Sequence, residues 1–197
     1  MKRMRLLFVG VGGQGTLLAS RLLGEACMKE GIPVLLSEVH GMAQRGGVVE
    51  STVMLGGLKS PLISPGEADV LIGFEPLETL RAISYCNQNS VVITSLSPIV
   101  PNVVKLGAAQ YPDVSSVFER IRSRVSGFYA CDAEELATKA GSPKSVNVLL
   151  LGMLMGTGLV PVSLESMEET IKTQVKPKTV EANLKAFRTG VELVSGK

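Results

Sequence analysis

Four glycines near the N-terminus form the first set of residues whose spacing could support chemistry. Gly10, Gly12 and Gly15 have the spacing G-x-G-x-x-G, and Gly13 adds a fourth glycine. They stand between an apolar run and a segment with helical periodicity. At such a turn, glycine lets an anion approach the backbone closely, and the helix that follows offers unpaired N–H groups. The pattern predicts a phosphate-binding loop, to which Gln14 could add a side-chain amide.

A second glycine-rich loop follows the next apolar run. Residues 38–47 read EVHGMAQRGG and contain His40, the only histidine of the chain, together with Gln44, Arg45 and Gly46. An imidazole, an amide and a guanidinium beside glycines could all reach a ligand that approaches the backbone. We interpret these four residues, with the first loop, as candidate cofactor-binding residues. The alternative is an exposed loop whose arginine forms an ordinary salt bridge.

The spacing of the first loop is also the fingerprint of dinucleotide-binding folds. In such folds an acidic residue about twenty positions further on accepts hydrogen bonds from the ribose, and Glu38 stands at the end of the expected second strand. The loop alone is therefore compatible with an NAD-dependent oxidoreductase, or with glycines that serve only tight packing. No catalytic residue can be assigned, because a Ser-His-Asp or Cys-His arrangement could be built only around His40 and none is apparent.

Composition excludes several classes of protein. The 197 residues carry a formal net charge of +2, with three tyrosines, five phenylalanines and no tryptophan, so neither a basic surface nor a stacking platform for nucleic acid is expected. Cys27, Cys86 and Cys131 are far apart in the sequence, which favours reduced thiols in a cytoplasmic protein and predicts no metal site. The apolar run after Met1 is too short for a signal peptide and is expected to be the first strand.

The alternation of apolar runs with helical patterns predicts an α/β fold, with a three-layer, Rossmann-like, mixed but mostly parallel sheet. Gly56-Gly57 favours a hairpin, which would attach an antiparallel edge pair. Helices are expected after Gly15, at Pro76, around Val117 and after Asp132, where Asp132-x-x-Glu135 has the form of a capping box. Strands are expected at Leu6–Val9, Val34–Ser37, Val48–Leu55, Asp69–Phe74, Val91–Thr94, Val103–Val104 and Phe128–Cys131.

From Ser142 onward the chain is expected to be helical. Val146–Met155 is apolar almost all round but too short to span a bilayer, which needs about 20 residues. We expect a buried helix there, in which Gly152 and Gly156 allow close packing with another helix, followed by amphipathic helices. A single domain over residues 1–197 is predicted, with an α/β core at 1–141 and a helical extension at 142–197. Its apolar helices predict a large interface with a partner, and self-association of the isolated chain.

Together, the two loops resemble the gamma-type domain of the 2-oxoacid:ferredoxin oxidoreductases. The resemblance rests on Gly10-Val11-Gly12-Gly13-Gln14-Gly15 followed by Glu38-Val39-His40-Gly41-Met42-Ala43-Gln44-Arg45-Gly46-Gly47. It covers the whole chain, including Asn147–Gly158 and Lys185-Ala186-Phe187. The second loop, with its composition and its distance from the first, is the specific part of the pattern.

The resemblance implies a subunit of a thiamine-diphosphate-dependent enzyme that is inactive alone. Such enzymes convert a 2-oxoacid, here expected to be an arylpyruvate such as indolepyruvate, and coenzyme A to an acyl-CoA, carbon dioxide and reduced ferredoxin. Thiamine diphosphate and the iron–sulfur clusters would belong to a larger partner subunit, since this chain has no clustered cysteines and no Gly-Asp-Gly stretch. The glycine loops would lie at the subunit interface, near the thiamine site or the coenzyme A phosphates. A purely structural subunit without a ligand is the remaining alternative.

Overall fold

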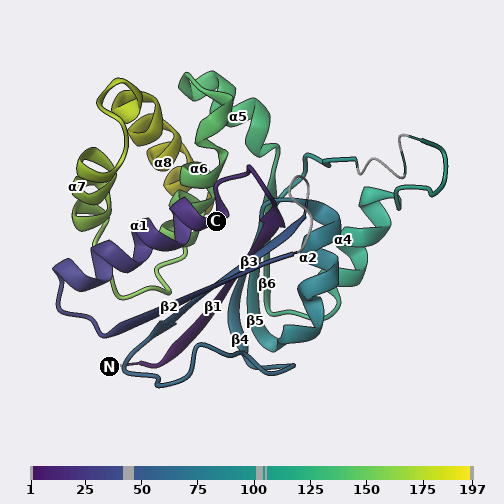
Figure 1. The fold of residues 1–197 in the computed structure, drawn as a ribbon, viewed down its shortest axis with the longest axis horizontal. Coiled ribbons are helices and arrows are strands. Elements are labelled where there is room, and N and C mark those ends of the chain that lie inside the picture. The colour runs from purple at the N-terminus through teal and green to yellow at the C-terminus, as the bar shows by residue number, and fades with distance from the viewer. Residues whose placement is uncertain (1, 42–46, 101–103, 105, 196–197) are drawn as a thin grey trace.

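The computed structural model describes residues 2–41, 47–100, 104 and 106–195. Six strands form one sheet in the order β2-β3-β1-β4-β5-β6 (Figure 1). β1, β4, β5 and β6 are parallel, and β3 is antiparallel to both of its neighbours, β1 and β2. The prediction of a mixed, mostly parallel sheet is confirmed. The strands are β1 (Met4–Val11), β2 (Val34–His40), β3 (Val48–Leu55), β4 (Ala68–Gly73), β5 (Cys86–Ser95) and β6 (Gly127–Cys131).

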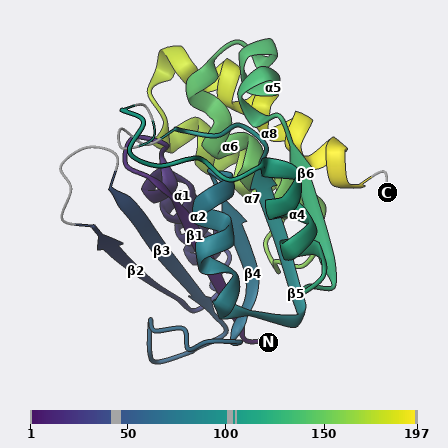
Figure 2. The same cartoon turned by 90° about the vertical axis from the view of Figure 1, so that its right-hand side faces the viewer.

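Helices cover both faces of the sheet and produce three layers (Figures 1 and 2). One face carries α1 (Thr16–Lys29), α5 (Ala133–Ala140), α6 (Val146–Gly156), α7 (Leu164–Gln174) and α8 (Val180–Ser195). The other carries α2 (Pro76–Ala82) and α4 (Val114–Arg122), which leave β2 and β3 uncovered in Figure 2. Short 3-10 turns lie at η1 (Ile83–Tyr85), η2 (Pro143–Ser145) and η3 (Pro177–Thr179).

The two hydrophobic cores follow from the alternation of side chains along β1. Leu6 and Phe8 point into the larger core beneath α1 and α6, whereas Leu7 and Val9 point into the smaller core beneath α2 and α4. Successive residues of a strand face opposite sides of a sheet, so an apolar run of this kind is needed where both faces are covered. β1 is therefore buried at the centre of the molecule, and its carboxyl end carries the first glycine loop.

The C-terminal helices pack closely because glycines line the contact between α6 and α8. A Cβ atom on Gly152 would lie 2.1 Å from the carbonyl oxygen of Phe187, and one on Gly190 would lie 2.1 Å from that of Leu149. The predicted packing role of Gly152 and Gly156 is confirmed. No helix in the described part of the chain has both the length and the apolar character needed to cross a membrane.

The hairpin predicted at Gly56-Gly57 is wrong: the chain pairs β2 with β3 through the preceding loop, and β3 lies inside the sheet between β2 and β1. Gly56 has φ of 78° and lies against the backbone of Lys2, so a glycine there lets the two backbone segments approach closely. Of the strand predicted at Val103–Val104, only Val104 is described.

Candidate functional site

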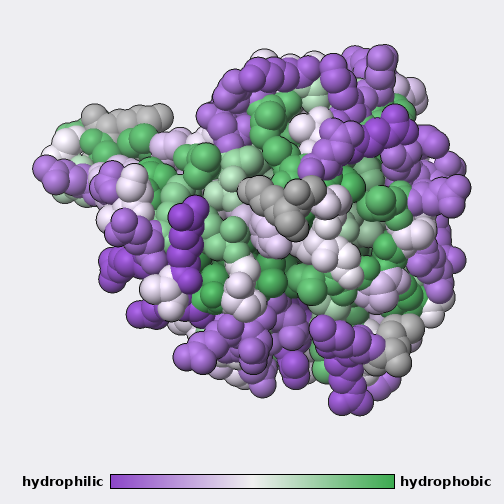
Figure 3. Space-filling view, turned by 180° about the vertical axis from the view of Figure 1, so that it is seen from behind, coloured by the Kyte–Doolittle hydropathy of each residue, from purple (hydrophilic) through white to green (hydrophobic). Residues whose placement is uncertain are grey.

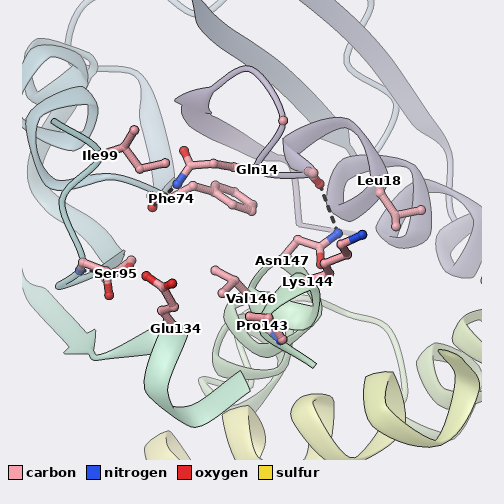
Figure 4. Close-up of a pocket in the computed structure, with 13 residues that line it drawn as sticks. Gln14, Leu18, Phe74, Ser95, Ile99, Glu134, Pro143, Lys144, Val146 and Asn147 are labelled. Carbon is pink, nitrogen blue, oxygen red and sulfur yellow. Dashed lines mark hydrogen bonds between the residues drawn. The ribbon is translucent and has the colours of Figure 1, made fainter. Parts of the chain in front are cut away.

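The principal cavity lies at the carboxyl ends of the strands, where the chain leaves the sheet in two directions. β1 continues into α1 on one face, and the neighbouring strand β4 continues into α2 on the other. Such a reversal opens a crevice in α/β sheets. The cavity has a volume of about 600 Å³ (Figure 4). Its lining residues are Gly13, Gln14, Gly15, Leu18, Phe74, Ser95, Ser97, Ile99, Glu134, Pro143, Lys144, Val146 and Asn147.

The first glycine loop turns sharply between β1 and α1. Gly13 has φ of 102° and Gly15 has φ of 81°, backbone conformations in which a side chain is strained. Gly10 is required for a different reason, since a Cβ atom there would lie 2.8 Å from Oε1 of Gln14 and 2.9 Å from the Cβ of Phe74. Gly10, Gly13 and Gly15 thus occupy positions that other residues could take only with strain or displacement.

Gln14 lines the cavity, but its amide is already used within the protein. Oε1 accepts a hydrogen bond from the backbone N–H of Val11 at 2.8 Å, and Nε2 donates one to the carbonyl oxygen of Phe74 at 2.8 Å. The side chain therefore ties the glycine loop to the end of β4. Sequence reasoning assigned this amide to the ligand; the structure places it as a clamp of the loop that would hold the ligand.

The N-terminus of α1 opens toward the cavity without a side-chain cap. Gly15 occupies the N-cap position, and no acidic residue stands in the first turn. The first N–H groups of an α-helix have no partner within the helix and carry a partial positive charge, so an anion is favoured there. Asn147 of α6 donates from Nδ2 to the carbonyl oxygen of Gly15 at 3.3 Å and holds the loop from the other side.

The cavity lining also contains polar residues that were not predicted from the sequence. Ser95 ends β5, Ser97 follows it, Glu134 begins α5, and Lys144 lies in η2. Glu134, in the first turn of α5, lines the cavity, as Figure 4 shows. Ser95, Ser97 and Glu134 could have been found from their place at or shortly after the ends of expected strands, because the carboxyl ends of parallel strands share one edge of the sheet. Lys144 follows α5, so this signal does not reach it.

The second glycine loop lies beside the first. The backbone N–H of Gly12 donates to the carbonyl oxygen of Gly47 at 2.9 Å, which joins the two loops directly. His40 is the last residue of β2, and its backbone pairs with Val49 of β3. Gln44, Arg45 and Gly46 lie outside the described residues, so their assignment to the site stays a prediction.

The acidic residue required for an NAD-binding site is not where that function needs it. In the dinucleotide fold the second strand neighbours the first, but here β3 lies between β1 and β2. The side chain of Glu38 forms a salt bridge with Arg21 of α1, with 3.3 Å between Nε and Oε1. The geometry thus gives no support to ribose recognition by Glu38.

The residues that the structure describes do not fit an iron–sulfur cluster or a bound metal. They contain no group of three or more histidine, cysteine or acidic side chains that could hold an ion. Cys27 and Cys131 are buried in the large core, and Cys131 donates to the sulfur of Met153 at 3.4 Å. Because thiolates are the ligands that clusters need, separate buried thiols do not provide such a site.

Known proteins resemble this chain over almost its full length. Residues 5–193 match the family described as pyruvate ferredoxin/flavodoxin oxidoreductase. The indolepyruvate oxidoreductase subunit IorB of Archaeoglobus fulgidus is 41% identical over 196 residues, which cover 99% of this chain and 98% of that protein.

Two solved structures share the fold. The gamma subunit of a keto/oxoacid ferredoxin oxidoreductase from Geobacter sulfurreducens has a TM-score of 0.72 at 23% identity, with 98% of this chain and 99% of that chain covered. The 2-oxoglutarate:ferredoxin oxidoreductase of Magnetococcus marinus, with 2-oxoglutarate, coenzyme A and succinyl-CoA bound, has a TM-score of 0.74 at 20% identity. All of this chain matches 32% of that longer chain.

Proposed function

Because the chain belongs to the pyruvate ferredoxin/flavodoxin oxidoreductase family, we propose that it is the small subunit of an indolepyruvate or arylpyruvate oxidoreductase. The assembled enzyme would convert the 2-oxoacid and coenzyme A to an acyl-CoA, carbon dioxide and reduced ferredoxin in the cytoplasm. The substrate class is supported by the nearly full-length likeness to an indolepyruvate oxidoreductase subunit. Thiamine diphosphate and the iron–sulfur clusters are assigned to the larger subunit, where they supply the decarboxylation and electron-transfer chemistry.

We propose that the 600 Å³ cavity receives the phosphate-bearing part of coenzyme A. The observation that carries this proposal is the uncapped N-terminus of α1, which opens into the cavity beside Gly13 and Gly15. Backbone N–H groups of the loop would hold a phosphate, and Lys144, which lines the same cavity, would add a positive charge. Leu18 and Ile99 provide apolar contact area at the same cavity. Positioned in this way, the cosubstrate would reach the partner's site in a fixed orientation.

The second loop would complete the site from the side of β2 and β3. The hydrogen bond between Gly12 and Gly47 holds the base of this loop against the phosphate loop. His40, Gln44 and Arg45 are thereby proposed to supply polar groups near the same ligand. If Arg45 meets a phosphate, Arg45→Ala should weaken coenzyme A binding by about tenfold to hundredfold, since a charge-assisted hydrogen bond contributes about 1.5–3 kcal/mol. A silent Arg45→Ala would favour a purely structural subunit.

The assembly is tested by anaerobic reconstitution with the large subunit. The isolated chain should be colourless and inactive with indolepyruvate. Added to the large subunit, it should restore or enhance coenzyme A-dependent dye reduction. No gain on mixing would contradict the proposed function, and saturable NAD binding by the isolated chain in a calorimetric titration would favour an independent dehydrogenase instead.

The cavity assignment is tested by the steady-state kinetics of the reconstituted enzyme. Lys144→Gln should raise KM for coenzyme A by about threefold to tenfold, because an exposed charge contributes about 1 kcal/mol or slightly more to binding. The matched control is Lys139→Gln, since Lys139 pairs with Glu135 on the exposed side of α5. Equal KM values for the two variants would remove Lys144 from the site.

A further inference from the structure

A buried carboxylate stands at the corner between β4 and α2. Glu75 is only 2% exposed, and its side chain accepts three hydrogen bonds. Oε2 accepts from the backbone N–H of Glu78 at 3.0 Å, which caps α2. Oε1 accepts from the backbone N–H of Ile99 at 3.2 Å and from the hydroxyl group of Tyr111. A buried carboxylate is costly unless such donors compensate its lost hydration, so this arrangement specifies one position for each partner.

The corner between β4 and α2 is hydrogen-bonded to two separate parts of the cavity lining. The carbonyl oxygen of Phe74 accepts from Gln14 of the glycine loop, and the next residue, Glu75, accepts from Ile99, which also lines the cavity. The backbone of Glu75 is itself fixed, because its carbonyl oxygen accepts from the N–H of Thr79 at 3.0 Å and from its hydroxyl at 2.8 Å. The position of Ile99 relative to the glycine loop therefore depends on Phe74 and Glu75, two consecutive residues of one turn.

Ile99 has little else to hold it. Its side chain is 43% exposed, and it lines the cavity from residues 97–100, which belong to no helix or strand. Tyr111, which lies shortly before the start of α4, donates its hydroxyl hydrogen bond to the same oxygen of Glu75. Burial and the hydrogen bond to Glu75 raise the pKa of Tyr111, so the phenol remains a donor at neutral pH. One carboxylate oxygen thus holds both Ile99 and Tyr111.

We propose that Glu75 is a positioning residue, which fixes the Ser97–Ile99 wall at the distance from the glycine loop that the bound ligand requires. The proposal rests on the proposed function only for the identity of that ligand as coenzyme A. The two carboxylate oxygens have separate tasks: Oε2 caps the helix and Oε1 holds the wall. Loss of the hydrogen bonds to Oε1 should weaken ligand binding without slowing the reaction of the bound ligand.

Glu75→Asp separates these two tasks. Aspartate is a good N-cap, so α2 keeps its cap, but the side chain is one methylene shorter and cannot span the distance to Ile99 in the same position. Tyr111→Phe removes one donor and leaves the cap intact. Ser163→Ala is the control, because Ser163 caps α7 far from the cavity through a hydrogen bond from the N–H of Ser166.

Two measurements on the full chain test the proposal. In hydrogen exchange of the folded protein, Glu75→Asp should make the amide of Ile99 exchange about tenfold faster or more, with Tyr111→Phe intermediate and Ser163→Ala unchanged. In the reconstituted complex, Glu75→Asp should raise KM for coenzyme A about tenfold, with kcat within twofold of the unsubstituted enzyme.

Exchange at Ile99 that stays at its original rate in Glu75→Asp would overturn the proposal, and so would faster exchange without a change in KM. A fall in kcat at unchanged KM would also contradict it. The exchange measurement needs no ligand. Failure of the proposed function, seen as an unsubstituted complex that does not depend on coenzyme A, is therefore distinguishable from failure of this inference.

Discussion

At the scale of single residues, Gln14 links the glycine loop to β4 through both ends of its amide. Gln14→Leu retains a similar volume but leaves the N–H of Val11 and the carbonyl oxygen of Phe74 without this partner. We expect the free energy of unfolding to fall by about 1–3 kcal/mol, the cost of unpaired, partly buried polar groups. Urea unfolding measures it, with Gln88→Leu on an exposed part of β5 as the control. Equal stability of the two variants would show that the clamp is unimportant.

The buried thiols should make stability depend on pH under alkaline conditions. Burial, and then the charge of Glu30, raises the pKa of Cys27 from 9.0 to about 12. Burial, and then Asp132, raises the pKa of Cys131 to about 12. The folded state holds these protons more tightly than the unfolded state. The contribution to stability is therefore complete below pH 9 and is lost as the pH rises toward 12.

The expected slope is a loss of about 1.4 kcal/mol per pH unit for each thiol once the unfolded thiol ionises. Unfolding in urea between about pH 8 and pH 11 measures this slope. Other groups also titrate in this range, so the comparison is with Cys27→Ala, whose slope should be smaller by the share of one thiol. Identical slopes for the two proteins would contradict the prediction.

At the scale of elements, the contact between α6 and α8 should be the least tolerant of added volume. Gly152→Ala would place a methyl group 2.1 Å from the carbonyl oxygen of Phe187, and neither backbone can move without separating the helices. We expect a loss of about 3 kcal/mol or more in the free energy of unfolding. The gain in helix propensity from alanine, about 1 kcal/mol, is too small to offset it.

Thermal or urea unfolding measures this loss. Lys185→Ala, at an exposed position of α8, is the control and should be close to neutral. Equal stability of Gly152→Ala and Lys185→Ala would contradict the prediction, because it would mean that α6 and α8 can separate at little cost. We do not expect this, since both helices contribute to one shared core.

Over the protein as a whole, some apolar side chains remain exposed on the surface and lie outside the two hydrophobic cores. Figure 3 shows hydrophobic residues gathered across the middle of one face and hydrophilic residues around them, with a projecting segment at its edge. Leu106 is 83% exposed and therefore contributes little to the core. An apolar area with a polar rim is typical of a surface that binds another protein.

We predict that the exposed Leu106 contacts the large subunit, so Leu106→Asp should weaken binding of that subunit without loss of thermal stability. Burial of a leucine side chain contributes about 1.5–3 kcal/mol, so the dissociation constant should rise about tenfold to hundredfold. Light scattering and sedimentation of the mixed subunits measure it. Leu164→Asp, at the exposed start of α7, is the control. Unchanged affinity in Leu106→Asp would exclude this residue from the interface.

Features that depend on neighbours along the chain could be predicted from the amino-acid sequence alone. Apolar runs marked β1, β4, β5 and β6, and the capping pattern at Asp132 predicted the start of α5, where its side chain accepts from the N–H of Glu135 at 3.0 Å. The glycine spacing predicted the turn between β1 and α1, where Gly13 and Gly15 adopt backbone conformations that other residues rarely adopt. These signals are local, so they can be read without knowledge of the tertiary structure.

The contacts between segments that are distant in the sequence could not be predicted in this way, because they depend on the folded structure. The insertion of β3 between β1 and β2 separates Glu38 from the glycine loop, although the spacing alone favoured a dinucleotide site. Glu134 enters the cavity, and Glu75 joins Ile99 to Tyr111, through contacts between residues far apart in the sequence. No local periodicity encodes such contacts, because they follow from strand order and from the packing of helices on a shared sheet.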